Sequence, residues 1–192
     1  MSKYYYHAVD SFENFIKILN DGEIKSARLL GKTIEKDYLN LGLNGLDYIC
    51  LCNKLNKYVL GYNSFESFIV DSYCFIISDD IDVLKPVVFE WNNDADYLEA
   101  KSKALNEGVQ LSPFIDEYRI KYRITMDKII GIGIPFDKNY IGFEEKAKQI
   151  IAIAQALNLD IVDSSDEYFI EKYEAYKDYK QQNEEKIRRF SL

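Results

Sequence analysis

Short apolar and aromatic runs alternate along the chain with longer segments in which apolar residues recur every three or four positions. The first run, YYYHAV at 4–9, predicts a strand. Between residues 12 and 19 the apolar positions then fall on one face of a helix. Ser11 is a suitable N-cap for this helix, and Gly22 suits the left-handed conformation that often ends one. We therefore expect the chain to begin with a strand, a helix and a glycine stop.

The same two patterns predict the rest of the fold. Short apolar runs bounded by polar residues indicate strands, whereas spacings of three and four indicate helices. The predicted elements do not alternate regularly as strand, helix, strand, so we expect an α+β domain and not a doubly wound parallel sheet. Further strands are predicted at 47–52, 72–78, 87–91, 119–124, 128–136 and 159–165, and further helices at 94–107, 143–157 and 166–190.

The C-terminal segment, residues 166–192, differs from the rest in composition. It is strongly charged and carries only a thin apolar seam of Phe169, Tyr173 and Tyr176. A seam this narrow buries little surface against a core. We predict one domain over 1–165, followed by a charged helix that is docked on the domain or projects from it.

Composition narrows the classes of function. With 192 residues, 47% of them hydrophobic, the chain is long enough for a folded domain with a real core. No apolar run approaches the ~18 residues of a membrane helix, and the N-terminus does not resemble a signal peptide. Three cysteines make a disulfide framework improbable and favour a reducing cytoplasm. A net charge of −8 opposes general binding to nucleic acid, so a protein partner is favoured.

The only histidine, His7, leaves few chemistries open. It could meet Cys50, Cys52 or Cys74 in space, but these cysteines occupy apolar strands, where a free thiol is usually a small core residue. One histidine without a cysteine cluster also lacks the ligands of a structural zinc site. The motif GIGIP at 131–135 has neither the third glycine nor the following helix of a dinucleotide fingerprint, so its glycines favour close strand packing or a bulge.

Three stretches in a fixed order point to a family. They are YYYHAVDSFENFIKILNDGEIKS near the N-terminus, GLDYICL at 45–51, and DEYRIKYRITMDKIIGI at 116–132. Together they resemble the His-Tyr-Glu signatures of ADP-ribosyltransferase-like domains, which include poly(ADP-ribose) polymerase-like enzymes and bacterial toxins. The stretches lie within about residues 3–136, and residues 137–192 have no counterpart in the resemblance.

The resemblance implies a fold, a substrate and roles for residues. It implies split antiparallel sheets around a cleft that binds NAD as substrate, with release of nicotinamide and transfer of ADP-ribose to a macromolecule, a protein before a nucleic acid. Glu117, His7 and Tyr48 would be the catalytic residues. NAD would contact His7, Ala8, Tyr48 and Cys50, with Cys50 an alternative to Tyr48 in the middle signature.

The chemistry of these side chains fits such a reaction. Loss of nicotinamide leaves an oxocarbenium-like ribose, as in glycoside hydrolysis. A carboxylate such as Glu117 stabilises that cation or accepts the proton of the incoming nucleophile. An imidazole can hold a ribose hydroxyl, and a tyrosine ring can stack on nicotinamide.

A second hypothesis belongs to another class. With 32 acidic against 24 basic residues and 16 tyrosines, the chain could be a non-catalytic binding or inhibitor protein, for example a nucleic-acid mimic. The two hypotheses predict different arrangements of side chains. A transferase requires His7 and Glu117 to converge on a pocket, whereas a mimic requires acids gathered on one face.

Overall fold

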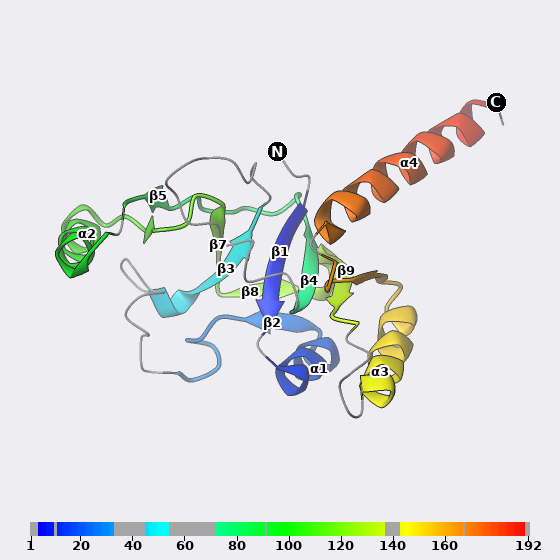
Figure 1. The fold of residues 1–192 in the computed structure, drawn as a ribbon, viewed down its shortest axis with the longest axis horizontal. Coiled ribbons are helices and arrows are strands. Elements are labelled where there is room, and N and C mark those ends of the chain that lie inside the picture. The colour runs from blue at the N-terminus through cyan, green and yellow to red at the C-terminus, as the bar shows by residue number, and fades with distance from the viewer. Residues whose placement is uncertain are drawn as a thin grey trace.

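The computed structural model describes residues 4–9, 11–32, 45–53, 72–90, 92–136, 143–166 and 168–190. It confirms an α+β fold with four helices in this part of the chain (Figure 1). The helices are α1 (Phe12–Asp21), α2 (Asp94–Glu107), α3 (Phe143–Ala156) and α4 (Phe169–Phe190). The strands are β1 (Tyr4–Val9), β2 (Glu23–Lys25), β3 (Tyr48–Cys52), β4 (Tyr73–Ser78), β5 (Val87–Val88), β6 (Leu111–Ser112), β7 (Glu117–Lys121), β8 (Arg123–Thr125), β9 (Ile129–Ile134) and β10 (Asp160–Asp163).

A six-stranded sheet forms the centre of the molecule, in the order β10-β9-β4-β1-β3-β7. All neighbouring strands run antiparallel except β9 and β10, which are parallel. Two small sheets, β2 with β8 and β5 with β6, stand beside it. The resemblance predicted split sheets around a cleft. One strand of each signature, β1, β3 and β7, lies in the large sheet, whereas β2 from the first signature and β8 from the third pair with each other in a separate two-stranded sheet. The arrangement of split sheets around an NAD cleft stays a prediction.

Helices cover both faces of this sheet. One face packs against α1 and α3 through a core that includes Phe15, Phe75 and Ile150. The opposite face packs against the start of α4 through Tyr6, Ile76 and other buried residues. We call these the α1 face and the α4 face. Phe169, Ile170 and Tyr173 of α4 are buried there, while the rest of that helix extends away from the sheet (Figure 1).

The first helix is capped as the sequence predicts. The Ser11 hydroxyl accepts a hydrogen bond from the backbone N–H of Asn14, at 3.2 Å. At the other end Gly22 has φ 72°, and its N–H donates to the carbonyl of Ile18. Both termini therefore have partners for backbone groups that a helix leaves unsatisfied.

Two predicted strands differ from the observed ones. The run at 119–124 is divided into β7 and β8 because Tyr122, with φ 69°, adopts a left-handed conformation. This turn carries the chain from the large sheet into the pairing of β8 with β2. The strand predicted at 87–91 covers only Val87–Val88, and Trp91 lies outside the described residues.

The glycines of GIGIP permit close packing, as predicted. A Cβ added to Gly133 would lie 2.4 Å from Sγ of Cys74 on β4, and one added to Gly131 would lie 3.1 Å from the carbonyl oxygen of Asp160 on β10. The register between β4 and β9 also shifts between Ile76 and Ile77. Larger residues would therefore push apart three neighbouring strands.

Candidate functional site

The three strands that carry the predicted residues are neighbours in the sheet. His7 lies on β1, Tyr48 on β3 and Glu117 at the start of β7, and these strands are adjacent in that order. Strand order therefore brings together segments that are far apart in sequence.

The register assigns most of the candidate side chains to the α4 face. Tyr6 pairs with Cys52, and Cys52 pairs with Glu117, so these three side chains share a face. Cys50 pairs with Arg119, and Tyr48 pairs with Lys121, two and four residues farther along the same strands. Ala8 pairs with Cys74, which belongs to the core of the α4 face. Ala8, Tyr48, Cys50 and Glu117 are therefore on one side of the sheet.

His7 is on the other side. It pairs with Phe75, whose ring is part of the core of the α1 face. Its Nδ1 lies 2.9 Å from the carbonyl oxygen of Cys50 and donates a hydrogen bond to it. His7 thus contacts the backbone of the strand that carries Tyr48 and Cys50, but it does not share a sheet face with Glu117.

Glu117 lies in a buried polar network. Its side chain is 3% exposed and that of Arg119 is 2% exposed, and Nε of Arg119 lies 2.8 Å from Oε1 of Glu117. The Ser112 hydroxyl donates to Oε2. Arg119 also donates to the side-chain oxygen of Gln110 and to the carbonyl of Leu111, at 2.9 Å. Both carboxylate oxygens of Glu117 therefore have protein partners.

The pKa of Arg119 reflects this environment. Burial is the largest single influence and would lower the pKa of the guanidinium, but the charge and hydrogen bond of Glu117 act together with other nearby groups, outweigh burial and raise the pKa. Cys50 and Tyr48 also lie close enough to contribute. Burial, together with the negative charge of Glu117, raises the pKa of the Cys50 thiol. Cys50 is thus held in its neutral form, which is a poor nucleophile.

The segment just before β7 is fixed by a lysine. Nζ of Lys85 donates to the carbonyls of Ile115 and Glu117, the latter at 3.0 Å, and lies 4.3 Å from the centre of the Tyr118 ring. The preceding residue, Leu84, exchanges backbone hydrogen bonds with Arg119 on the outer edge of β7. Asp116 is fully buried, and its Oδ2 accepts a hydrogen bond from Sγ of Cys52 at 3.4 Å. Both acids at this position are therefore inside the protein.

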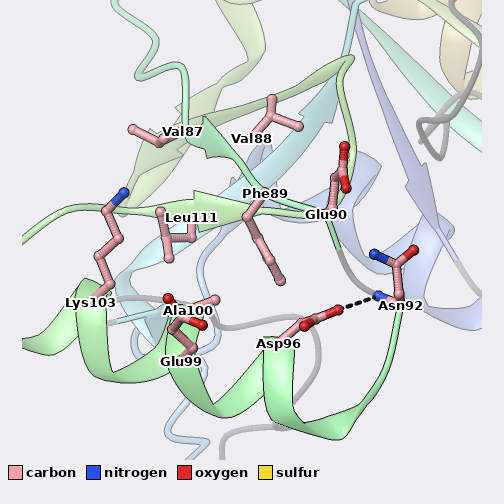
Figure 2. A pocket seen from close by; sticks show the side chains of 10 residues that line it. All are labelled: Val87, Val88, Phe89, Glu90, Asn92, Asp96, Glu99, Ala100, Lys103 and Leu111. Atoms are coloured by element: carbon pink, nitrogen blue, oxygen red, sulfur yellow. Dashed lines mark hydrogen bonds between the residues drawn. The ribbon is translucent and has the colours of Figure 1, made fainter.

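Two cavities lie elsewhere, and neither is lined by His7, Tyr48 or Glu117. One, of about 280 Å³, lies between α2 and the β5–β6 pair (Figure 2). The other, of about 530 Å³, lies between β10 and α4. Leu111 lines the first cavity and precedes Ser112, the residue that bonds Glu117.

The partners of Glu117 were missing from the sequence prediction. Arg119 follows Glu117 by two positions, so the strand alternation already places both side chains on one face and would have suggested an ion pair. Ser112, which bonds Glu117, and Gln110, which bonds Arg119, carry no comparable signal, because their contacts depend on how β6 packs beside β7.

Comparisons with protein-family models, with curated proteins and with solved structures find no match. The family resemblance of the three stretches therefore stays a prediction. No helix within the described ranges has the length and apolar character needed to span a bilayer.

Proposed function

We propose that the chain is an NAD-dependent ADP-ribosyltransferase in which Glu117 acts on the ribose. One observation supports this most: Ala8, Tyr48, Cys50 and Glu117 lie on one face of three adjacent strands. These are four of the five residues for which the family resemblance implies a role. We assign the NAD-binding surface to this face.

His7 receives a different role in this proposal. Because it faces the opposite side of the sheet, it does not contact NAD directly. Its hydrogen bond to the carbonyl of Cys50 positions β3, which lies between the strand of Ala8 and the strand of Glu117. His7 is thus a positioning residue.

The reaction follows from the chemistry of the carboxylate. The bond between nicotinamide and C1′ of the ribose breaks, and its electron pair leaves with the nicotinamide nitrogen, which becomes neutral. The negative charge of Glu117 stabilises the resulting oxocarbenium-like cation. The acceptor then forms a bond to C1′, and its proton passes to Glu117. Tyr48 supplies an aromatic face for nicotinamide.

NAD can reach Glu117 only if one of its present partners moves. The carboxylate is 3% exposed and is bonded by Arg119 and Ser112. Arg119 is on the same strand as Glu117, whereas Ser112 belongs to the two-residue strand β6. We therefore expect β6 to be displaced when NAD binds, with Arg119 remaining beside the carboxylate to orient it.

The same burial favours a second candidate function. If the pair of Glu117 and Arg119 is only structural, the chain is an acidic protein that binds a partner without catalysis. A catalytic carboxylate must approach its substrate to about 3 Å, and this one is enclosed. Binding of NAD separates the two functions.

NAD binding is tested by calorimetry and by thermal unfolding at millimolar NAD. A ligand that binds only the folded state raises the midpoint of unfolding, so the transferase hypothesis predicts a rise that grows with NAD concentration. Tyr48→Leu should reduce this rise, because it removes the ring that stacks on nicotinamide. Tyr97→Leu on α2 is the matched control. Flat responses of the wild-type protein by both methods would favour the binding protein.

A further inference from the structure

The cavity between α2 and the β5–β6 pair has an apolar floor. Phe89 points from the strand side toward the helix, and Leu111 and Ala100 lie beside it (Figure 2). Leu111 and Ala100 are buried, and Phe89 packs against them. The volume of about 280 Å³ lies just below the ~300–1,000 Å³ of most small-molecule pockets. It suits an occupant the size of one long side chain.

The rim of this cavity is negatively charged. Three carboxylates, those of Glu90, Asp96 and Glu99, line it together with one ammonium group, that of Lys103. Asp96 is engaged at the start of α2, where its Oδ2 accepts from the backbone N–H of Asn92 at 2.9 Å. Within the described part of the chain, Glu90 and Glu99 make no hydrogen bond or ion pair. Two carboxylates are therefore available to a cation that enters the cavity.

An aromatic floor below free carboxylates suits a particular cation. A guanidinium group is planar, stacks on aromatic rings and pairs with carboxylates through several N–H groups at once. Its aliphatic stem can lie along apolar residues such as Val88 and Leu111. A lysine ammonium is more strongly hydrated and has no flat face to stack. We propose that this cavity binds an arginine side chain of a protein partner.

The cavity lies next to the residues that bond Arg119 and Glu117. Leu111 lines it, and the carbonyl of Leu111 accepts a hydrogen bond from Arg119. The next residue, Ser112, donates to Glu117. An arginine anchored here therefore holds its protein beside the strand that covers Glu117. The contact does not depend on catalysis, because a partner-binding protein would use the same anchor.

The test is an NMR titration of the full chain with N-acetylarginine amide. We expect saturable chemical-shift changes centred on residues 87–90 and 96–111. N-acetylcitrulline amide has nearly the same shape without the charge and should bind at least about fivefold more weakly. The lysine analogue should fall between the two, since it keeps the charge but loses the planar stacking.

Variants test whether each charged side chain of the cavity strengthens or weakens arginine binding. Glu90→Gln and Glu99→Gln should each weaken arginine binding about two- to fivefold, the range for an exposed ion pair. Lys103→Met should strengthen it, because a like charge is removed from the rim. Glu107→Gln, at the exposed end of the same helix, is the matched control and should leave the affinity unchanged.

Three results would overturn the assignment. They are the absence of a saturable shift with the arginine compound, equal affinity for the citrulline compound, and an affinity that is unaffected by both glutamate substitutions. Spectra of each variant without ligand show whether α2 is still folded. If Glu99→Gln disturbs the helix, Glu90→Gln and Lys103→Met still decide the outcome, because they predict opposite changes.

Discussion

The two ends of the central sheet are built in different ways. At one end, β4, β9 and β10 pack through isoleucines, a buried cysteine and glycines that leave room for neighbouring strands. At the other end, β3 and β7 enclose a charged pair, Glu117 and Arg119, with hydrogen bonds to every carboxylate oxygen. The end with β9 and β10 is stabilised by close packing, and the end with β7 is stabilised by electrostatic pairing. Substitutions at the two ends should therefore reduce the stability of the protein for different physical reasons.

The largest effect on stability should come from breaking the charged pair. Glu117→Gln leaves the guanidinium of Arg119 buried without its anion, which typically costs about 3–5 kcal/mol. The double substitution Glu117→Gln with Arg119→Met removes the stranded charge and should recover much of the loss. Urea unfolding of the three proteins measures this. A cost of Glu117→Gln below about 1 kcal/mol would mean that water reaches the pair in solution.

At the glycine-containing end, Gly133→Ala should cost about 1–3 kcal/mol, the range for an added methyl group in a packed core. The new Cβ would meet Sγ of Cys74 at 2.4 Å. Adding Cys74→Ala should relieve this clash. Thermal unfolding of the single and double variants provides the measurement. Equal stability of Gly133→Ala and wild type would show that β4 and β9 are less closely packed than described.

A smaller effect is expected away from both ends of the sheet, at the cap of α1. Ser11→Ala removes the acceptor for the N–H of Asn14 and should cost about 1 kcal/mol. Ser11→Asp keeps an acceptor and should stay near wild type. If Ser11→Ala and Ser11→Asp unfold at the same urea concentration, the cap does not contribute to stability.

The smallest expected effect is a change in the pKa of one of two cysteine thiols, which lie at opposite ends of the sheet. Burial raises the pKa of Cys74 to about 12, whereas the pKa of Cys50 is raised by burial and additionally by the charge of Glu117. Glu117→Gln should therefore lower the pKa of Cys50 and leave that of Cys74 unchanged. Alkylation rates of the two thiols as a function of pH test this. Faster reaction of both thiols would instead indicate that the variant has opened.

Cys74 also gives stability a pH dependence of known sign. An unfolded thiol ionises near pH 8.5, whereas the folded Cys74 stays protonated to about pH 12. The folded state thus binds more protons in this interval, so its stability falls as pH rises from about 8.5. Below about pH 8.5 the Cys74 thiol is protonated in both the folded and the unfolded state, so it causes no change of stability with pH there. A Cys74→Ala variant should show a weaker decline between pH 9 and 11.

The sequence predicted the apolar end of the molecule better than the polar end. Periodicity and end signals such as Ser11 and Gly22 depend on nearby residues, and they located α1, β9 and most other elements. The division of β7 from β8 depends on Tyr122, whose backbone is left-handed. Residues other than glycine rarely adopt this conformation, and the pattern of apolar and polar positions does not predict it.

The candidate site was predicted less completely for a geometric reason. Adjacency of the three signature strands is observed, but strand order does not determine which face a side chain occupies. A shift of one residue in register moves a side chain to the opposite face, and this separates His7 from Glu117. Of the two partners of Glu117, Arg119 lies on the same strand and follows from its alternation, whereas Ser112 lies on β6 and could not be found without the packing of that strand.

The most direct test of the proposed function is turnover of NAD labelled in its ADP-ribose part, with a cell lysate as the source of acceptors. The wild-type protein should release nicotinamide and transfer the label to protein. Glu117→Gln, assayed where unfolding curves show it folded, should lose about 10²-fold or more in rate, while Asp116→Asn should retain activity. Absence of turnover by the wild type, or equal turnover by Glu117→Gln, would contradict the assignment of Glu117 as the catalytic carboxylate.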